Sequence, residues 1–510
     1  MPAKLLVIGL DGADATLLRQ WSDAGDLPVL RALRTRGVSV ALTSPPGFGD
    51  DATWASLYTG VSPAKHGRYF YSQLRPGTYE LQPFADADLK RPPLWESLSR
   101  AGRRVAIIDV PKCPLADDLN GIQLVDWSVH GHDHAHVESW PRSLAAQVVA
   151  QFGAEPSNVC NRDLDGADDA FRDHLLAGID KKAALAAHYL DHDDWDLFLT
   201  VFKESHCIGH RCWHLLDPAH PQHDAAAAAT LGNPIKQIYM ALDAAVGRLL
   251  ERAGAETTVI VFSPLGMSAN YTGEPLLDEI LLRLDGADAV RTRQRIARIE
   301  SVWQRVPFSI RQRAHHRLDW ARRRAHYVAT RRRRCFVLPH NEISGAIRIN
   351  LVGREPNGVI HPGAEYDALC TALIRDLREL VNLDTGTPLV QDVIRTREIY
   401  RGEHADRLPD LLVVWQRTAP IASAGSPKIG EILKPHPFGR SGDHIYRSGN
   451  HMPNGFLAAS GPGIVPAELA VPMAVTDIAP TIAAFLGVRG GDYDGTPIAA
   501  ITPTDRMHGE

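Results

Sequence analysis

The chain has 510 residues and a formal net charge of −5, with 55 lysines and arginines against 60 aspartates and glutamates. This length allows two to four domain-sized units with large buried cores. The small negative charge gives the surface no general attraction to nucleic acid or to an anionic membrane. No apolar run approaches the roughly 20 residues that span a bilayer, so the sequence predicts a globular protein without a membrane segment.

The cysteines and histidines are distributed in opposite ways. The six cysteines are scattered, without any C-x-x-C pair, over positions 113, 160, 207, 212, 335 and 370. This scatter favours reduced thiols and predicts a cytoplasmic setting. The 23 histidines, in contrast, gather in a few segments. Their clustering is the main functional hint in the composition.

The N-terminal segment predicts a buried strand over 4–10 that ends in Asp11 and Gly12, followed by an amphipathic helix. Open α/β sheets place their chemistry at the carboxyl ends of parallel strands, so Asp11 is a candidate site residue. A helix-capping role is the alternative. Further on, a loop rich in proline and glycine ends at Asp50 and Asp51. The helical spacing over 52–58 puts this pair at a helix N-terminus, which also favours a bound anion.

Strand-like runs recur along the chain with helical patterns between them. They cover 104–110, 197–202, 257–262 and 411–415. This alternation predicts a doubly wound α/β fold. Toward the C-terminus, 345–351 is strand-like, and 366–380 and 477–486 have helical patterns.

Two segments concentrate histidine. Within 202–217, His206, His210 and His214 are spaced four residues apart and share one helix face. Two such imidazoles can hold one metal ion, as in an H-E-x-x-H helix, although a hydrogen-bonded structural face has the same spacing. Within 126–137, histidines alternate at positions 130, 132, 134 and 136. This second segment is either a metal cluster or a polar lid, and the lid is favoured.

The segment 287–334 is rich in arginine, free of glycine and helical in pattern. We therefore predict a helical insertion over 281–337, with 1–280 and 338–510 forming the catalytic core. A solvated insertion is favoured, and the alternative is a cap that guides an anionic substrate.

The motifs taken together resemble the alkaline phosphatase superfamily, in particular its type I phosphodiesterase/nucleotide pyrophosphatase branch. They occur in the family's order, and they are VIGLDG at 7–12, WASLYTGVSPAKHG at 54–67, HCIGH at 206–210, TTVIVFS at 257–263, GNHMPNG at 449–455 and TDIAPTIAAFLGV…DGTPI at 476–498. The resemblance implies a three-layer α/β fold with a mixed, mainly parallel central sheet. It also implies a two-metal site at the strand ends and a threonine or serine nucleophile.

Compared residue by residue, the sequence differs from the family pattern at the positions of the metal ligands and the nucleophile. The first aspartate ligand matches Asp11, but the nucleophile position falls on Asp50, with Thr53 nearby as the nearest hydroxyl. The D-x-x-x-H ligand pair becomes His206 and His210, and the last histidine ligand matches His451. The S-D-H-G loop becomes S-P-L-G at 263–266, which removes both of its ligands.

The changed ligand positions fall into two groups, one for each of the two metals that the resemblance implies. One metal would have His206, His210 and His451, a set that suits Zn²⁺ with an open fourth position. The other would keep only Asp11 and Asp50, a poor zinc site that Mg²⁺ could still use. We therefore predict one zinc ion per chain, with a second divalent ion left open. Asp50 or Asp51 would act as general base, fourth ligand or carboxylate nucleophile, and Asp11 would orient it.

The sequence thus predicts a cytoplasmic, metal-dependent hydrolase of a small anionic phosphoester or sulfoester. One alternative is a mono-zinc enzyme that cleaves another bond, of the amide, carbamoyl or P–N type. Another is a binding protein without catalysis. The expected partner is a small anionic substrate and not a nucleic acid polymer or a membrane, and a homodimer is left open. Four further residues are weaker candidates for lining or supporting the site, namely Lys203, Glu204, His214 and Asn270.

Overall fold

The computed structural model describes residues 3–128, 137–153, 168–286, 330, 332–341, 343–433 and 447–502. The chain divides into two compact units, the first with residues 1–69, 85–270 and 438–510, and the second with residues 70–84 and 271–437. Most of the arginine-rich insertion lies outside the described residues, so its helical character stays a prediction. Residues 338–437, which the sequence analysis grouped with the core, belong to the second unit.

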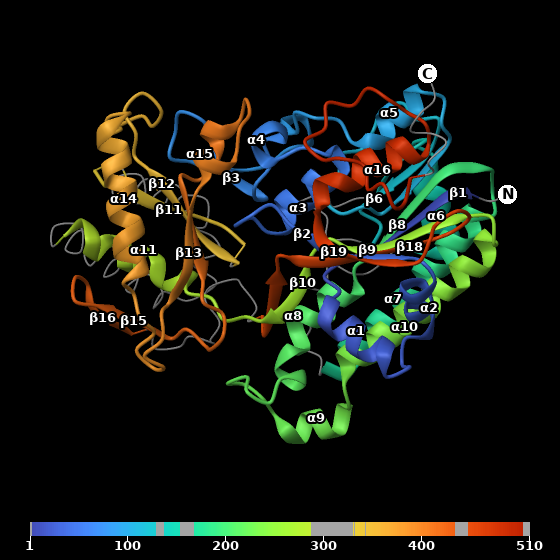
Figure 1. Ribbon diagram of the computed structural model, residues 1–510, viewed down its shortest axis with the longest axis horizontal. Helices are drawn as coiled ribbons and strands as arrows, with labels where there is room; N and C mark the ends of the chain where they lie inside the picture. The colour runs from blue at the N-terminus through green and yellow to red at the C-terminus, as the bar shows by residue number, and fades with distance from the viewer. Residues whose placement is uncertain are drawn as a thin grey trace, which may run out of the picture. The chain divides into compact units, whose positions relative to one another are not determined.

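The first unit is built on a nine-stranded sheet (Figure 1). Its strands in spatial order are β19 (Ala467–Ala474), β2 (Val38–Thr43), β18 (Asn454–Ser460), β9 (Thr258–Ser263), β1 (Ala3–Leu10), β8 (Trp195–Phe202), β5 (Val105–Ile108), β6 (Gly121–Val125) and β7 (Glu138–Trp140). The five strands from β9 to β6 are parallel, whereas β18 and β7 run antiparallel to their neighbours. The sheet is therefore mixed and mainly parallel, as predicted.

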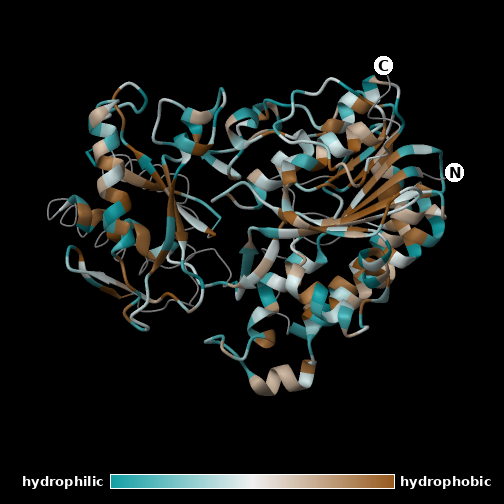
Figure 2. Cartoon of the chain, in the orientation of Figure 1, coloured by the Kyte–Doolittle hydropathy of each residue, from teal (hydrophilic) through white to brown (hydrophobic). Residues whose placement is uncertain are grey.

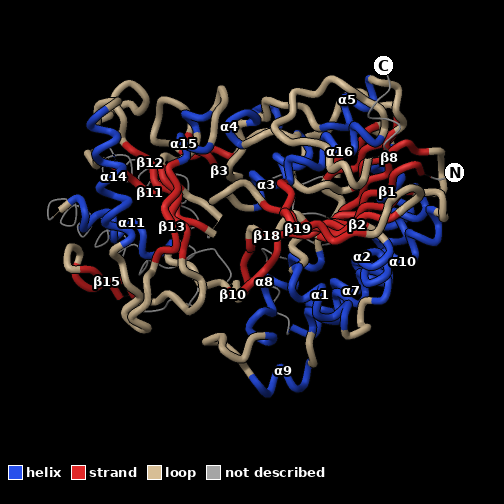
Figure 3. The backbone as a smooth tube through the Cα atoms, viewed as in Figure 1, coloured by secondary structure: helices blue, strands red, loops and turns tan. Residues whose placement is uncertain are grey.

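Helices cover both faces of this sheet, which gives three layers (Figure 1 and Figure 3). On one face lie α1 (Ala15–Asp23), α2 (Pro28–Arg36), α7 (Asp168–Leu190) and α10 (Pro234–Ala253). On the other face lie α3 (Asp50–Thr59), α5 (Leu94–Arg100) and α16 (Ile478–Phe485). The remaining elements of this unit are α4 (Pro63–His66), α6 (Leu144–Phe152), α8 (Glu204–Leu216), α9 (Ala225–Leu231), β10 (Gly266–Ala269) and β17 (Gly449–Met452).

The central strands are apolar along their whole length because both faces of a parallel sheet are covered. Every residue of β9 is buried, and β8 is buried at seven of its eight positions. Figure 2 shows these strands as a hydrophobic fan between more polar helices. Side chains from the strands pack with α3, α5 and α16 in one core that includes Leu199, Trp54, Leu98 and Ile482. This packing explains why the strand runs were recognisable from the sequence.

The second unit has a separate core and a four-stranded antiparallel sheet, in the order β11 (Cys335–Leu338), β12 (Ser344–Ile349), β14 (Leu411–Trp415) and β13 (Val390–Arg395). Its other elements are α11 (Glu274–Asp285), α14 (Ala364–Arg378), α15 (Thr396–Ile399), β3 (Ser72–Leu74), β4 (Leu81–Pro83), β15 (Ser423–Ser426) and β16 (Gly430–Leu433). The run at 411–415 is thus a strand, as predicted, but it does not join the doubly wound sheet. Strand patterns alone do not say which sheet a strand enters.

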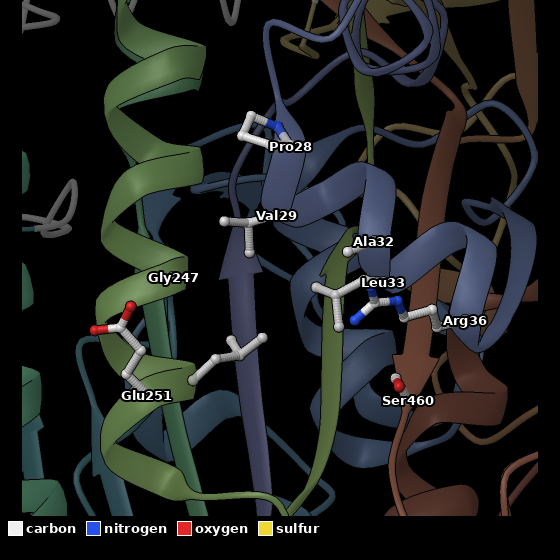
Figure 4. Close-up of a pocket in the computed structure, with 9 residues that line it drawn as sticks. Pro28, Val29, Ala32, Leu33, Arg36, Gly247, Glu251 and Ser460 are labelled. Atoms are coloured by element: carbon white, nitrogen blue, oxygen red, sulfur yellow. The ribbon is translucent and has the colours of Figure 1, made fainter.

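A shallow groove of about 400 Å³ lies between α2 and α10 (Figure 4). Its lining is mainly apolar, with Pro28, Val29 and Leu33 from α2, and Arg36 and Glu251 are its charged residues. Ser460 ends the antiparallel strand β18, so this groove belongs to the amino-terminal edge of the parallel strands. It therefore lies at the edge opposite to the one where such folds place their chemistry.

The cysteines correct one expectation. Cys113, Cys212, Cys335 and Cys370 are free, but Cys207 is disulfide-bonded. The prediction of reduced thiols is therefore wrong at Cys207, because pairing depends on spatial separation and not on sequence spacing. The argument for a cytoplasmic setting loses its basis with it. Among the described helices, none is long and apolar enough to cross a membrane.

A core substitution tests the packing of the central sheet. Leu199 on β8 is 1 % exposed and packs in the main core. Replacement by alanine leaves a cavity, so we expect Leu199→Ala to lower the free energy of unfolding by about 2–5 kcal/mol. Urea denaturation followed by tryptophan fluorescence measures this change. Val149→Ala, at a 37 % exposed position of α6, is the control and should change stability little. Equal stability of both variants would contradict the assigned packing.

Candidate metal centre

Three buried histidines meet at the carboxyl edge of the sheet. His206 and His210 come from α8, and His451 comes from β17. Their ligand atoms all lie within 4.8 Å of one another. The Nε2 atoms of His206 and His210 are 3.0 Å apart, and the His206 and His451 rings are stacked with centroids 4.8 Å apart. The structure therefore brings together the three histidines that the sequence proposed as one ligand set.

The ring of His210 is oriented by the backbone. Its Nδ1 atom donates a hydrogen bond to the carbonyl oxygen of Gly449 at 2.8 Å. Because a carbonyl only accepts, the proton sits on Nδ1 and the lone pair of Nε2 faces His206. Metal-bound imidazoles commonly make such a hydrogen bond with their second nitrogen. Three converging imidazoles with this support fit a zinc ion better than a hard cation such as Mg²⁺.

Two close backbone approaches fix the position of α8. A Cβ atom at Gly449 would lie 2.2 Å from the carbonyl oxygen of Gly209, so α8 and β17 touch through glycine. At Gly12, φ is +66° and a Cβ would lie 3.0 Å from the Cα of His206. This positive φ and this close contact both favour glycine. The strand end after β1 therefore packs directly against the first histidine.

Strand β17 is paired with β10, which begins at Gly266, the last residue of the S-P-L-G segment. β10 pairs antiparallel with β17, and Met267 stands opposite His451. Ser263 donates its hydroxyl to the carbonyl of Leu265 at 2.6 Å, and Leu265 is fully buried. The segment after the S-P-L-G loop thus serves to position His451.

Asp11 lies beside this cluster but outside the group of three histidines. Its carboxylate accepts a hydrogen bond from Trp54 Nε1 at 3.2 Å, and the side chain is 4 % exposed. Burial and, to a smaller extent, the nearby charge of Asp50 raise the pKa of Asp11 to about 7. Ser205 donates to the Asp11 carbonyl at 2.7 Å, which ties this strand end to α8.

Asp50 and Asp51 start α3, as predicted, and each has a cationic partner. Lys112 donates to Asp50 Oδ2, and its ammonium lies 3.2 Å from Asp51 Oδ2. Arg68 donates to Asp51 Oδ1 through Nε at 3.2 Å and Nη2 at 3.0 Å. Burial raises the pKa of Asp50, but the charge and the hydrogen bond of Lys112, together with His451, outweigh it and hold that pKa below its usual value. His451 adds to this lowering, which places Asp50 within electrostatic reach of the histidines.

Sequence reasoning missed Lys112 and Arg68. Lys112 follows the carboxyl end of β5, and Arg68 follows the AKHG motif. A lysine just beyond a buried strand was a usable signal, since the same rule selected Asp11. The pairings were not readable, because they join segments 62 residues apart for Lys112 and Asp50 and 17 residues apart for Arg68 and Asp51.

The other sequence candidates have local hydrogen-bond roles. Thr53 is fully buried and donates its hydroxyl to the Gly49 carbonyl at 2.8 Å within α3. His214 lies outside the cluster, and its Nδ1 donates to the Arg211 carbonyl at 3.1 Å. Asn270 receives a hydrogen bond from Asn450, next to His451, at 3.3 Å.

The remaining sequence candidates lie at the start of α8 or outside the described residues. Lys203 and Glu204 are buried at the start of α8, next to the histidine helix face. The alternating histidines at 130, 132, 134 and 136 lie outside the described residues, so the second metal cluster or lid stays a prediction.

The family match places the chain among the hydrolases of the alkaline phosphatase superfamily, and the three-histidine cluster is a group able to hold a metal ion. The family model for type I phosphodiesterase/nucleotide pyrophosphatase matches residues 5–442, so the chain belongs to this family. This finding confirms the resemblance inferred from the motifs.

Solved structures agree on the fold. Murine ectonucleotide pyrophosphatase/phosphodiesterase 5 has a TM-score of 0.51 at 14 % identity, with 97 % of each chain covered. Phosphonoacetate hydrolase from Sinorhizobium meliloti 1021, in complex with phosphonoacetate, has a TM-score of 0.52 at 16 % identity, with 93 % of each chain covered. At these identities the likeness concerns the fold alone. No curated protein matches the sequence.

The contact between α8 and β17 gives a test of the centre's geometry. In Gly449→Ala the new methyl group meets the Gly209 carbonyl, so β17 must shift away from α8. We expect zinc affinity to fall about 10–100-fold, as when an outer support of a metal ligand is lost. Competition with a zinc chelator measures the affinity. Gly247→Ala is the control, since its methyl meets only the side chain of Val29 at 3.0 Å. Unchanged affinity in Gly449→Ala would contradict this positioning role.

A second test concerns Asp126, which follows the carboxyl end of β6. Burial, together with the charges of Asp109 and Asp86, raises its pKa to about 7. The unfolded carboxyl titrates near pH ~4, so the folded state holds this proton more tightly between about pH 4 and 7. The stability that depends on the proton is complete below pH 4 and is lost as the pH rises through 7.

Asp126→Asn removes this titration, and asparagine tolerates the φ of +58° at this position. We expect the variant to gain stability over the parent protein at pH 8, by about 1–3 kcal/mol more than at pH 5. Urea denaturation at the two pH values measures the difference. The control is Asp23→Asn at a mainly exposed carboxylate. A stability difference that is the same at both pH values would refute the assignment.

Proposed function

We propose that this protein hydrolyses a small anionic phosphoester or sulfoester with one metal ion, zinc, held by His206, His210 and His451. The observation that carries this proposal is the buried three-histidine cluster. Family membership supports the hydrolytic reaction. The replacement of two family ligands by Pro264 and Leu265 supports a single ion.

The protein residues around the cluster fit this chemistry. A zinc ion held by three imidazoles supplies Lewis-acid polarisation and lowers the pKa of bound water toward ~7. Asp50 presents a carboxylate at the N-terminus of α3, where one oxygen accepts from Lys112 and the other from the Asp51 amide at 3.0 Å. A carboxylate fixed in this way serves as general base or as nucleophile in place of the missing hydroxyl. Lys112 and Arg68 neutralise Asp50 and Asp51, so these carboxylates do not repel an anionic substrate.

A second candidate keeps the site and changes the bond that is cleaved. Transfer at an ester phosphorus gains from two metals that clamp the attacking and leaving oxygens. The loss of ligands at 264–265 and the engagement of Asp50 by Lys112 weaken such a clamp. Hydrolysis or elimination at an amide, carbamoyl or P–N bond with one zinc is therefore the alternative.

Metal content is the first measurement that tests the proposal. Elemental analysis should find one zinc per chain in the native protein and in Asp11→Ala, and less than about a tenth of that in His206→Ala. His214→Ala is the matched control, since this histidine lies on the same helix outside the cluster and should leave the zinc in place. Two ions in the native protein, with one lost in Asp11→Ala, would overturn the single-metal proposal.

Activity then separates the two candidates. We expect the zinc-loaded protein to cleave a member of a panel of phosphodiesters, phosphomonoesters, sulfate esters and phosphonates, and His206→Ala to lose about 10²-fold or more in kcat/KM. Activity confined to carbamoyl, amide or P–N substrates would favour the second candidate. Turnover that persists after complete removal of metal would refute both.

A further inference from the structure

Lys112 is the side chain that connects the carboxylates of the site. Its ammonium donates to Asp50 and lies 3.2 Å from the second oxygen of Asp51, while its own side chain is only 9 % exposed. Its charge also reaches Asp11, whose pKa it lowers against the effect of burial. One cation therefore acts on three carboxylates at the carboxyl edge of the sheet.

The backbone at Lys112 is held in a conformation that L-residues rarely adopt. Its φ is +58°, and Asp109, at the start of the same turn, has a φ of +59°. Non-glycine residues keep such values only where the surroundings determine them, and these residues gather at functional sites. Here Tyr58 donates its hydroxyl and Arg68 its Nη1 to the Lys112 carbonyl, both at 2.8 Å. The ammonium is thus placed by a fixed turn.

The pairing of the neighbouring charges indicates that Lys112 mainly neutralises Asp50. Asp51 has its other oxygen bound by the two donors of Arg68, and both side chains of that pair are 2 % exposed. This ion pair neutralises the negative charge of Asp51 within the core. Asp50 receives its compensation from Lys112, at the more accessible end of the cluster where the Asp50 side chain is 16 % exposed.

We propose that Lys112 is a positioning residue whose ammonium takes the place of a second divalent cation beside Asp50. The inference rests on the proposed single-metal site, and it names the group that takes the place of the second ion. Adjacent carboxylates attract hard divalent cations such as Mg²⁺ and Mn²⁺. The ammonium occupies the oxygens that such an ion would need and keeps Asp50 in one orientation toward the histidines. It does so without requiring a metal from solution.

The experiment measures binding of Mn²⁺ to the zinc-loaded protein by electron paramagnetic resonance. The native protein should bind no Mn²⁺ at this position. Lys112→Met and Lys112→Gln leave three carboxylates with one fewer cation, and both should gain a Mn²⁺ site at least about tenfold stronger than any in the native protein. Lys112→Arg keeps the charge and should stay without the site. The matched control is Lys65→Met, which removes a lysine paired with Asp494 in the same unit and should gain no site.

Two readouts keep this inference apart from the proposed function. Zinc per chain tests the three-histidine centre, whereas the gain of Mn²⁺ tests Lys112. A Mn²⁺ site gained in the neutral variants and absent from Lys112→Arg supports the inference. Strong Mn²⁺ binding by the native protein overturns it without any variant. Folded neutral variants that keep their zinc but gain no Mn²⁺ also overturn it, and they would limit Lys112 to a structural ion pair while the zinc centre stands.

Discussion

The contact of α8 with β17 is the constraint on which the site depends. The two elements approach so closely that the Gly209 carbonyl occupies the space of a side chain at Gly449. The same approach lets the Gly449 carbonyl accept the Nδ1 proton of His210. One backbone contact therefore sets both the separation of the histidines and the direction of a lone pair. Since α8 follows β8, and β17 pairs with β10, which follows β9, the parallel sheet fixes this contact from both sides.

The second organising feature is the balance of buried charge. Unpaired carboxylates at the carboxyl edge would carry a large desolvation cost, because burial disfavours the ionised form. The protein meets this cost in two ways. Asp51 and Asp50 are paired with Arg68 and Lys112, whereas Asp11 is left with a pKa of about 7. Side chains thus perform compensation that metal ions provide in many sites of this kind.

The sequence was informative where a pattern is local or a motif is specific. β1, β8, β9 and α8 were predicted within a few residues because their apolar runs and helical spacing are continuous, and the family motifs identified His451 as a partner of His206 and His210. What could not be predicted depends on pairing between distant segments. The antiparallel sheet that takes up 411–415, the Lys112 pair and the bonded state of Cys207 are each decided by proximity in space. Local periodicity carries no information about these contacts.

The proposed replacement of a metal by the Lys112 ammonium group has a consequence for substrate charge. A zinc ion at the histidines brings two positive charges, and the two cationic side chains cancel Asp50 and Asp51. With the proposed single zinc ion, the site would have the charge of one divalent ion beside Asp11, whose pKa is about 7, and a second metal would add two further positive charges. An ammonium also stabilises charge through directional hydrogen bonds and not by Lewis-acid polarisation. Such a site is better matched to a monoanionic ester, such as a phosphodiester or a sulfate ester, than to a phosphomonoester dianion that gains from two metals.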